Sequence, residues 1–264
     1  MDSGIFFAIL SFVLSCHFAH TNAQLRVLNG NDIAIEQTPH TVAILLKKGY
    51  KYKCVGALVS MELVVTSAKC VAYRLNKEFI AIAGIDDLSE IRTERAQQRE
   101  VHKIRAHNQF NFEQGYMDIA VVTVDSPFSS TNAIKSISIC PKDALDKEGT
   151  LLKVSGWGST ELGSMITSNR LQTADLRTMD KEKCRNLWKH HGKYFADTIM
   201  CAGRPGQNPY YRDRGAGGLV GGQLCALVSR ADESGRFPSI FTDLTNEEVR
   251  GYLVSKGVVI NDDC

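Results

Sequence analysis

The sequence predicts an all-β domain that ends in one helix. Short apolar runs rich in β-branched residues recur along the chain, and polar or glycine-containing turns separate them. This spacing is typical of β-barrels and β-sandwiches. The chain has 264 residues, of which 44% are hydrophobic and 23% charged. That composition is typical of a folded domain and excludes a largely disordered chain.

The expected elements follow one another from residue 40 onward. Strands are expected within residues 40–46, 54–66, 118–124, 151–156 and 223–228, the second range holding two. Near the end, Thr245 and Glu248 have the spacing of an N-terminal capping box, so a helix is expected to begin there. Val249, Tyr252 and Leu253 then share one helical face, and Gly257 favours its end.

Residues 1–23 are interpreted as a secretory signal peptide. Their mostly apolar run from Ile5 to Leu14 is shorter than the ~20 residues needed to span a bilayer, and small residues lead up to Ala23. Residues 24–26 are then a short propeptide-like segment. Because no repeat or linker interrupts the remainder of the chain, residues 27–264 are expected to form one domain, secreted and extracellular, without a membrane span.

The charges and cysteines limit the possible partners. The formal net charge of +2 gives no reason to expect nucleic-acid binding. Seven of the eight cysteines lie after the signal, and in a secreted chain they are expected to form disulfides. Zinc sites usually contain a CxxC pair, which the sequence lacks, so no metal is expected. Nothing in the sequence indicates a cofactor.

Six short motifs occur in a fixed order and carry a more specific signal. They are RVLNG at 26–30, the cysteine-bounded stretch at 54–70, DIA at 118–120, SGWG at 155–158, IMCAG at 199–203 and DRGAGGLV at 213–220. In this order they resemble the trypsin/chymotrypsin-like serine proteases, over essentially the whole of residues 27–264. The chain also resembles the non-catalytic homologues of that family, of the small type without a clip domain that occurs in insect haemolymph or seminal fluid.

The resemblance implies a specific architecture. Two six-stranded antiparallel β-barrels would pack together, with the active-site cleft between them and a C-terminal helix. The implied disulfides are Cys54–Cys70, Cys140–Cys225 and Cys184–Cys201. Cys264 is left over, and two alternatives remain for it: a free or capped thiol, or a disulfide to another chain.

The family's catalytic triad is degenerate at two of its three positions. A serine attacks, a histidine transfers the proton, and a buried aspartate orients the histidine. Lys69 stands at the histidine position, Asp118 at the aspartate position and Ala216 at the serine position. We expect a Lys69–Asp118 ion pair that keeps the lysine charged and therefore a poor base. Alanine offers no nucleophile.

The features around the triad are altered as well. Cleavage between Arg26 and Val27 would release an amino terminus, but the aspartate that receives it in the family is replaced by Gly215. Arg214 replaces the glycine whose amide forms half of the oxyanion hole.

The specificity pocket departs from the family pattern too. Tyr210 is assigned to the pocket base, and Ser239 to a position usually held by glycine. The disulfide that braces this pocket is missing, so the loop from residue 205 to 214 is expected to be mobile or repacked.

These features predict a secreted serine protease homologue without catalytic activity. It would act by binding an extracellular protein, such as an active protease or its substrate, as cofactor, decoy or scaffold in immunity or reproduction. The alternative is a residual or non-standard serine-type endopeptidase or other hydrolase, in which Lys69 serves as base for a different nucleophile.

Overall fold

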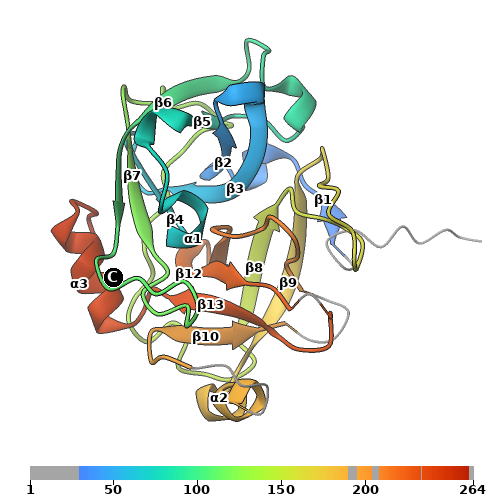
Figure 1. Ribbon diagram of the computed structural model, residues 1–264, viewed down its shortest axis with the longest axis vertical. Coiled ribbons are helices and arrows are strands. Elements are labelled where there is room, and N and C mark those ends of the chain that lie inside the picture. The colour runs from blue at the N-terminus through green and yellow to red at the C-terminus, as the bar shows by residue number, and fades with distance from the viewer. Residues whose placement is uncertain (1–29, 190–194, 204–207, 233, 262–264) are drawn as a thin grey trace, which may run out of the picture.

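A computed structural model describes residues 30–189, 195–203, 208–232 and 234–261, and Figure 1 shows them as two β-barrels joined into one body. In the first barrel the antiparallel strands close in the order β2-β3-β4-β7-β6-β5. Their bounds are Thr41–Leu46 (β2), Lys51–Leu58 (β3), Leu63–Thr66 (β4), Phe79–Ala83 (β5), Gln97–Ala106 (β6) and Ala120–Val124 (β7).

The second barrel is also antiparallel and closes in the order β9-β10-β13-β12-β11-β8, with β8 pairing back onto β9. Its strands are Leu151–Gly156 (β8), Gln172–Met179 (β9), Ile199–Ala202 (β10), Gly217–Val220 (β11), Gln223–Arg230 (β12) and Ser239–Asp243 (β13). A short strand, β1 (Asn31–Asp32), precedes the first barrel but pairs with β9 of the second. The predicted fold of two six-stranded barrels is therefore confirmed.

The side-chain pattern of each strand follows its surroundings. In β5 every residue is buried: Ile80 and Ile82 contribute to one apolar cluster, and Phe79 contributes to another on the opposite face. In β9, buried and exposed residues alternate, as expected for a strand with one face in water.

Three α-helices complete the described chain: Ala68–Val71 (α1), Lys181–Lys189 (α2) and Glu247–Ser255 (α3). Four short 3-10 turns cover Ile35–Gln37 (η1), Lys48–Tyr50 (η2), Asn76–Glu78 (η3) and Leu88–Glu90 (η4). The C-terminal helix is present as predicted, but its cap is not Thr245. The side chain of Asn246 accepts hydrogen bonds from the backbone N–H groups of Glu248 and Val249. The amide oxygen thus caps the helix one residue later than the capping-box spacing predicted.

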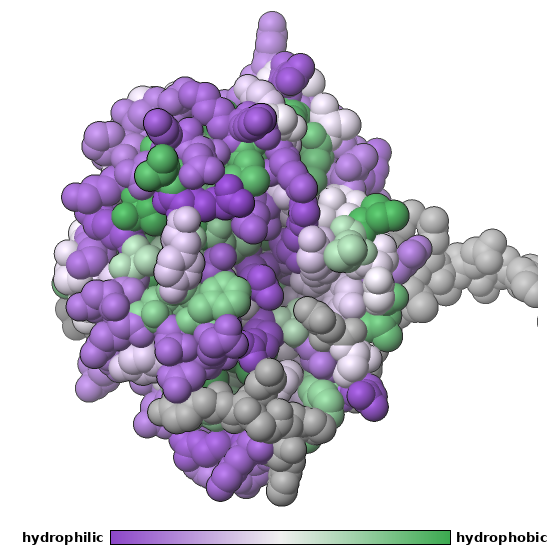
Figure 2. Space-filling view, viewed as in Figure 1, coloured by the Kyte–Doolittle hydropathy of each residue, from purple (hydrophilic) through white to green (hydrophobic). Residues whose placement is uncertain are grey.

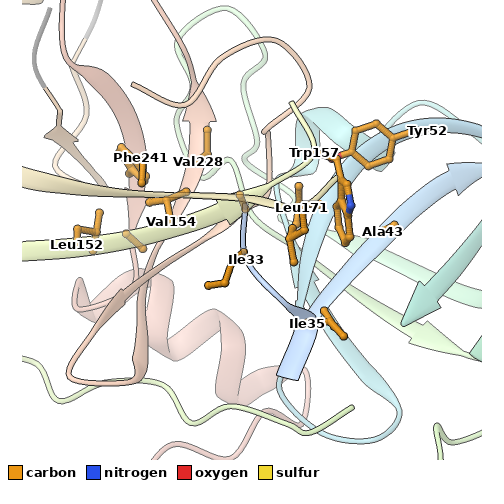
Figure 3. Packing of buried hydrophobic residues seen from close by; sticks show 14 of the residues in the cluster. Ile33, Ile35, Ala43, Tyr52, Leu152, Val154, Trp157, Leu171, Val228 and Phe241 are labelled. Atoms are coloured by element: carbon orange, nitrogen blue, oxygen red, sulfur yellow. The ribbon is translucent and has the colours of Figure 1, made fainter. Parts of the chain in front are cut away.

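The main apolar cluster is shared by the two barrels (Figure 3). Tyr52 and Ala43 from the first barrel lie beside Trp157, which directly follows β8 of the second. The rings of Tyr52 and Trp157 meet edge to face with their centroids 6.0 Å apart, and the Trp157 Nε1–H donates to Asp86 O at 3.1 Å. Because the cluster is shared, side-chain packing together with hydrogen bonds such as Trp157 Nε1–H to Asp86 O holds the two barrels against each other.

The three disulfides implied by the resemblance are all formed. Cys54–Cys70 ties β3 to α1, and Cys184–Cys201 ties α2 to β10. Cys140–Cys225 attaches the connection between the barrels to β12. Each bond therefore fixes a segment that the strand hydrogen bonds leave less constrained.

Candidate functional site

The turn that contains Ala216 is held by backbone hydrogen bonds of its own. The N–H of Ala216 donates to Asp213 O at 3.0 Å, and that of Gly215 donates to Val228 O at 2.7 Å. The Arg214 carbonyl accepts from Val55 N at 3.0 Å, which fastens the turn to β3. Ala216 is fully buried. In the family mechanism the amide of the nucleophile residue is an oxyanion donor, and here that amide already has a partner.

Gly215 occupies a conformation that a side chain would disturb. Its φ is +80°, in the left-handed region that favours glycine. A Cβ atom at this position would lie 2.2 Å from both Val55 O and Thr66 Oγ1. Since Val55 O is backbone of β3, it cannot move without disturbing the barrel. The turn is therefore built around glycine at the position where the family has its activation aspartate.

The predicted pairing of Lys69 with Asp118 is present in the structure. Lys69 lies in α1, Asp118 lies two residues before β7, and the Lys69 Nζ to Asp118 Oδ2 distance is 3.6 Å. Asp118 also accepts hydrogen bonds from Ser67 Oγ at 2.7 Å, Lys69 N at 2.9 Å and Ser229 Oγ at 2.6 Å. Its carboxylate is thus fully buried but well supplied with donors.

The Lys69 ammonium is buried as well, with 2% of its side chain exposed. It donates to Ser229 Oγ at 3.3 Å, so Ser229 connects the two charged groups. Burial lowers the pKa of Lys69, and Asp118 raises it by a smaller amount. We expected Asp118 to keep the lysine charged, but desolvation is the larger effect and disfavours the charged ammonium. The ion pair itself fills the place of a catalytic histidine.

Asp213 is a residue whose role sequence reasoning missed. Its carboxylate is buried and accepts hydrogen bonds from the N–H groups of Gly158 at 2.8 Å and Tyr210 at 2.9 Å. Desolvation raises the pKa of Asp213 to about 6 against these amides, which lower it. A buried carboxyl group thus does lie in the turn, two residues before the position where the family pattern would place it. The aspartate in DRGAGGLV was the available signal, but its partner at Gly158 is distant in sequence.

The two residues assigned to the specificity pocket are both buried. The Tyr210 hydroxyl accepts a hydrogen bond from Gly163 N at 2.9 Å, which draws residues 158–168 toward the cleft. Ser239 donates to Pro209 O at 3.4 Å through its hydroxyl and to Asn208 Oδ1 at 3.3 Å through its backbone N–H. Of the loop 205–214, residues 205–207 lie outside the described residues, and residues 208–210 pack against β13 and the loop that contains Gly163.

A cavity of about 600 Å³ opens beside this turn. Lys53 and Lys69 line it from the first barrel, and Tyr210, Arg212 and Arg214 line it from the second. The face shown in Figure 2 is hollowed near its centre, where hydrophilic residues predominate. The structure thus brings Lys69, Tyr210 and Arg214 together around one cleft. Ala216 lies buried behind that surface.

Several predicted features lie outside the described residues: the signal peptide, Arg26, Val27 and Cys264. Within the described ranges, no His, Cys, Asp and Glu side chains gather in a group of three or more that could hold a metal ion. None of the helices seen there is long and apolar enough to cross a membrane.

Two barrels with a cleft between them define the chymotrypsin-like architecture, and the comparisons agree. Residues 27–247 match the model of the trypsin family, so the chain belongs to that family. Trypsin epsilon of Drosophila erecta is 28% identical over 248 residues, covering 90% of this chain and 94% of that protein. Trypsin iota of Drosophila melanogaster is 25% identical over 249 residues, covering 91% of this chain and 93% of that protein.

Solved structures share the fold at low sequence identity. The scabies mite inactivated protease paralogue S-D1 superposes with a TM-score of 0.75 at 24% identity, covering 87% of this chain and 97% of that one. Neuropsin, a serine protease expressed in the limbic system of mouse brain, superposes with a TM-score of 0.75 at 21% sequence identity, covering 86% of this chain and 98% of that one. The same fold thus accommodates an inactivated paralogue and a protease, so the fold alone does not decide activity.

Proposed function

We propose that this chain is a secreted member of the trypsin family that has no peptidase activity and acts by binding an extracellular protein. The observation that carries the proposal is the turn at Ala216. Its side chain is a methyl group, and its N–H is bonded to Asp213 O. Both the attacking oxygen and one oxyanion donor of the family mechanism are therefore missing from one short segment.

The position of Lys69 supports the same conclusion. In a related mechanism, loss of the serine or the histidine alone lowers kcat by about 10⁶. Here both the serine and the histidine are replaced, and the Lys69 ammonium contacts Asp118 and Ser229. What could remain is the ~10³–10⁴-fold acceleration over water that binding and an oxyanion hole supply. With the Ala216 amide already bonded, we expect less than that.

The test is labelling of the purified secreted protein with a fluorophosphonate, combined with a broad peptide library and an active trypsin as positive control. We expect neither labelling nor cleavage, before or after cutting at Arg26. Stoichiometric labelling of a residue in the cleft, or peptide cleavage by the wild-type chain, would contradict the proposal. The binding role is tested by identifying the partner in the native fluid and measuring its affinity with purified proteins.

A second candidate is a hydrolase that uses Lys69 as base and Ser229 as nucleophile. It is favoured by the 3.3 Å contact between these side chains and by the lowered pKa of Lys69. Two observations oppose it: Ser229 is fully buried, and its hydroxyl already donates to Asp118 at 2.6 Å. Fluorophosphonate labelling that Ser229→Ala abolishes would support this candidate.

A further inference from the structure

The cleft between the barrels is lined by positive charge. Four cationic residues line the cavity: Lys53, Lys69, Arg212 and Arg214. Among the described residues that line it, none is an aspartate or glutamate. For a chain whose formal net charge is only +2, this is a local concentration of one sign. A cleft lined by one sign of charge attracts ligands of the opposite sign.

Two of these cations have partners within the protein. Lys69 is paired with Asp118. Arg212 donates to the backbone carbonyl of Tyr52 and lies 5.1 Å from the centre of the Tyr211 ring.

The other two cations have no such partner. In the described part of the chain, no hydrogen bond or ion pair reaches the charged ends of Lys53 and Arg214. Both side chains are half-buried. They are therefore cations in the cleft that still lack a counterion.

The backbone fixes these two cations close together. Lys53 is the additional residue at a β-bulge, because Ile44 pairs with Cys54 while Leu45 pairs with Tyr52. Bulges re-aim a side chain that regular pairing would direct elsewhere. Two residues further along β3, Val55 N donates to Arg214 O at 3.0 Å and so anchors the second cation.

The proximity of these charges affects the pKa of Lys53. Burial lowers the pKa of Lys53, and the positive charges of Arg74, Arg212 and Arg214 lower it further. The folded chain therefore holds like charges together, and a bound anion would relieve the repulsion.

The rim of the cleft is apolar on two sides. Met165 lines the cavity, and Ile166 beside it is 81% exposed. Next to Lys69, which lines the cavity from the first barrel, the exposed Phe112 ring has its centroid 5.9 Å from the Lys69 Nζ atom. The rings of Phe112 and Phe110 meet edge to face, and Phe110 in turn contacts the exposed ring of Tyr73. Exposed apolar groups that border a polar hollow are typical of a protein interaction site.

We propose that this cleft binds an acidic peptide segment of a protein partner. Carboxylates of the segment pair with Lys53 and Arg214, and its apolar side chains cover the rim. Arg214 suits this role because a guanidinium can bind a carboxylate through two parallel hydrogen bonds. A sulfated glycan supplies negative charge but no apolar groups, so it leaves the rim uncovered. The inference rests on the proposed function, since it names the class of ligand that the same cleft takes.

The test measures fluorescence anisotropy of a short labelled peptide of alternating glutamate and leucine, added to the full secreted chain. Binding is compared with the variant Lys53→Gln/Arg214→Gln. The matched control is Lys135→Gln/Lys153→Gln, two exposed lysines that do not line the cavity. We expect the cleft variant to raise Kd at least about tenfold, which corresponds to ~1.4 kcal/mol, and the control to leave it unchanged. Melting temperatures verify that each variant folds, and the single variants replace the double one if it does not.

Two further probes decide the chemistry of the ligand. The same peptide with glutamine in place of glutamate is expected to bind at least tenfold more weakly. Equal binding of the glutamine peptide, or no effect of the cleft variant, would overturn the inference. So would a heparin fragment that binds more tightly than the acidic peptide, because it would identify a glycan site.

Failure of the inference can be told apart from failure of the proposed function. If the native partner still binds the cleft variant with unchanged affinity while fluorophosphonate labels nothing, the binding role remains and only the site is wrong. If the wild-type chain is labelled, the proposed function itself fails, whatever the acidic peptide does.

Discussion

At the scale of single residues, Asp213 is a buried carboxyl group whose pKa depends strongly on its surroundings. Its carboxyl is buried, its partners are the N–H groups of Gly158 and Tyr210, and no ion pair to it occurs among the described residues. Burial disfavours the charged form, which is why its pKa rises to about 6. The carboxyl therefore keeps its proton in the folded state under conditions in which the unfolded chain has released it.

The pH dependence of stability follows from this difference. In the unfolded chain the group titrates near pH 4, and in the folded chain near pH 6. The folded state binds more protons between these values, so the contribution to stability is greatest below about pH 4 and is lost as pH rises to about 6. The full change is up to ~3 kcal/mol. Asp213→Asn, which cannot titrate, should lose this component when urea unfolding is compared at pH 5 and pH 7.5.

His40 must be separated from this measurement because it acts in the opposite direction. Burial lowers the pKa of His40 to about 4, so its contribution is present above about pH 6.5 and is lost as the pH falls. The quantity to compare is the difference between wild type and Asp213→Asn at each pH, in which the His40 contribution cancels. A difference that stays constant from pH 5 to 7.5 would show that Asp213 does not titrate in this range.

A residue of the site could be predicted where it and its partner both belong to recognisable motifs, and not where its contact joins segments without such a pattern. Lys69 and Asp118 were predicted as a pair because each belongs to a motif of its own, so both positions were known in advance. Asp213 and Lys53 were missed for a physical reason. The first depends on an amide at Gly158, and the second on a β-bulge in the pairing of β2 with β3. Neither contact leaves a regular pattern in the sequence.

At the scale of elements, the turn leading into β11 is shaped by the approach of β3. Gly215 must be glycine for two separate reasons, its φ of +80° and the lack of space for a Cβ. Gly222, in the turn between β11 and β12, shares only the first: its φ is +83°, and nothing lies within 4 Å of the Cβ position. The two glycines therefore form a matched pair that separates backbone strain from crowding.

We expect Gly215→Ala to destabilise the chain more than Gly222→Ala does. Left-handed φ costs an L-residue ~1–2 kcal/mol at either site. Only at Gly215 must the new methyl also displace Val55 O. The free energy of unfolding should therefore fall by ~1–3 kcal/mol more in Gly215→Ala than in Gly222→Ala, a difference typical of overpacking. Urea unfolding of both variants measures the difference. Equal losses would mean that the turn can move away from β3, in which case an aspartate could be restored at this position.

The elements themselves were predicted unevenly. Expected strands at 40–46 and 151–156 correspond closely to β2 and β8, because short, largely apolar runs bounded by turn residues are a strong signal. Helix α2 was not predicted, because it is short and mostly charged, and Cys184 and Trp188 are its only buried residues. The cap of α3 was placed at Thr245 because sequence spacing does not decide between adjacent capping side chains.

At the scale of the whole molecule, the sequence predicted the architecture through the order of its motifs and not through hydrophobic periodicity. Alternating strands indicate an all-β domain, but they do not show which strands pair or where a barrel closes. Closure of the first barrel depends on β2 pairing with β5 and on β4 pairing with β7, and that of the second barrel depends on β8 pairing with β11. These are long-range contacts, for which the family resemblance supplied the information.

The shared core predicts that the two barrels unfold together. Trp157 is fully buried between them, and its Nε1–H donates to Asp86 O. Trp157→Ala should cost ~3–5 kcal/mol, and Trp157→Phe less, because phenylalanine fills most of the space and loses only the hydrogen bond. Trp188→Ala is the control, since Trp188 packs in a cluster of the second barrel. In Trp157→Ala, the thermal unfolding curves followed by Trp188 fluorescence and by far-ultraviolet circular dichroism should give the same, lowered melting temperature. Two separate transitions, with only one shifted, would show that each barrel has an independent core.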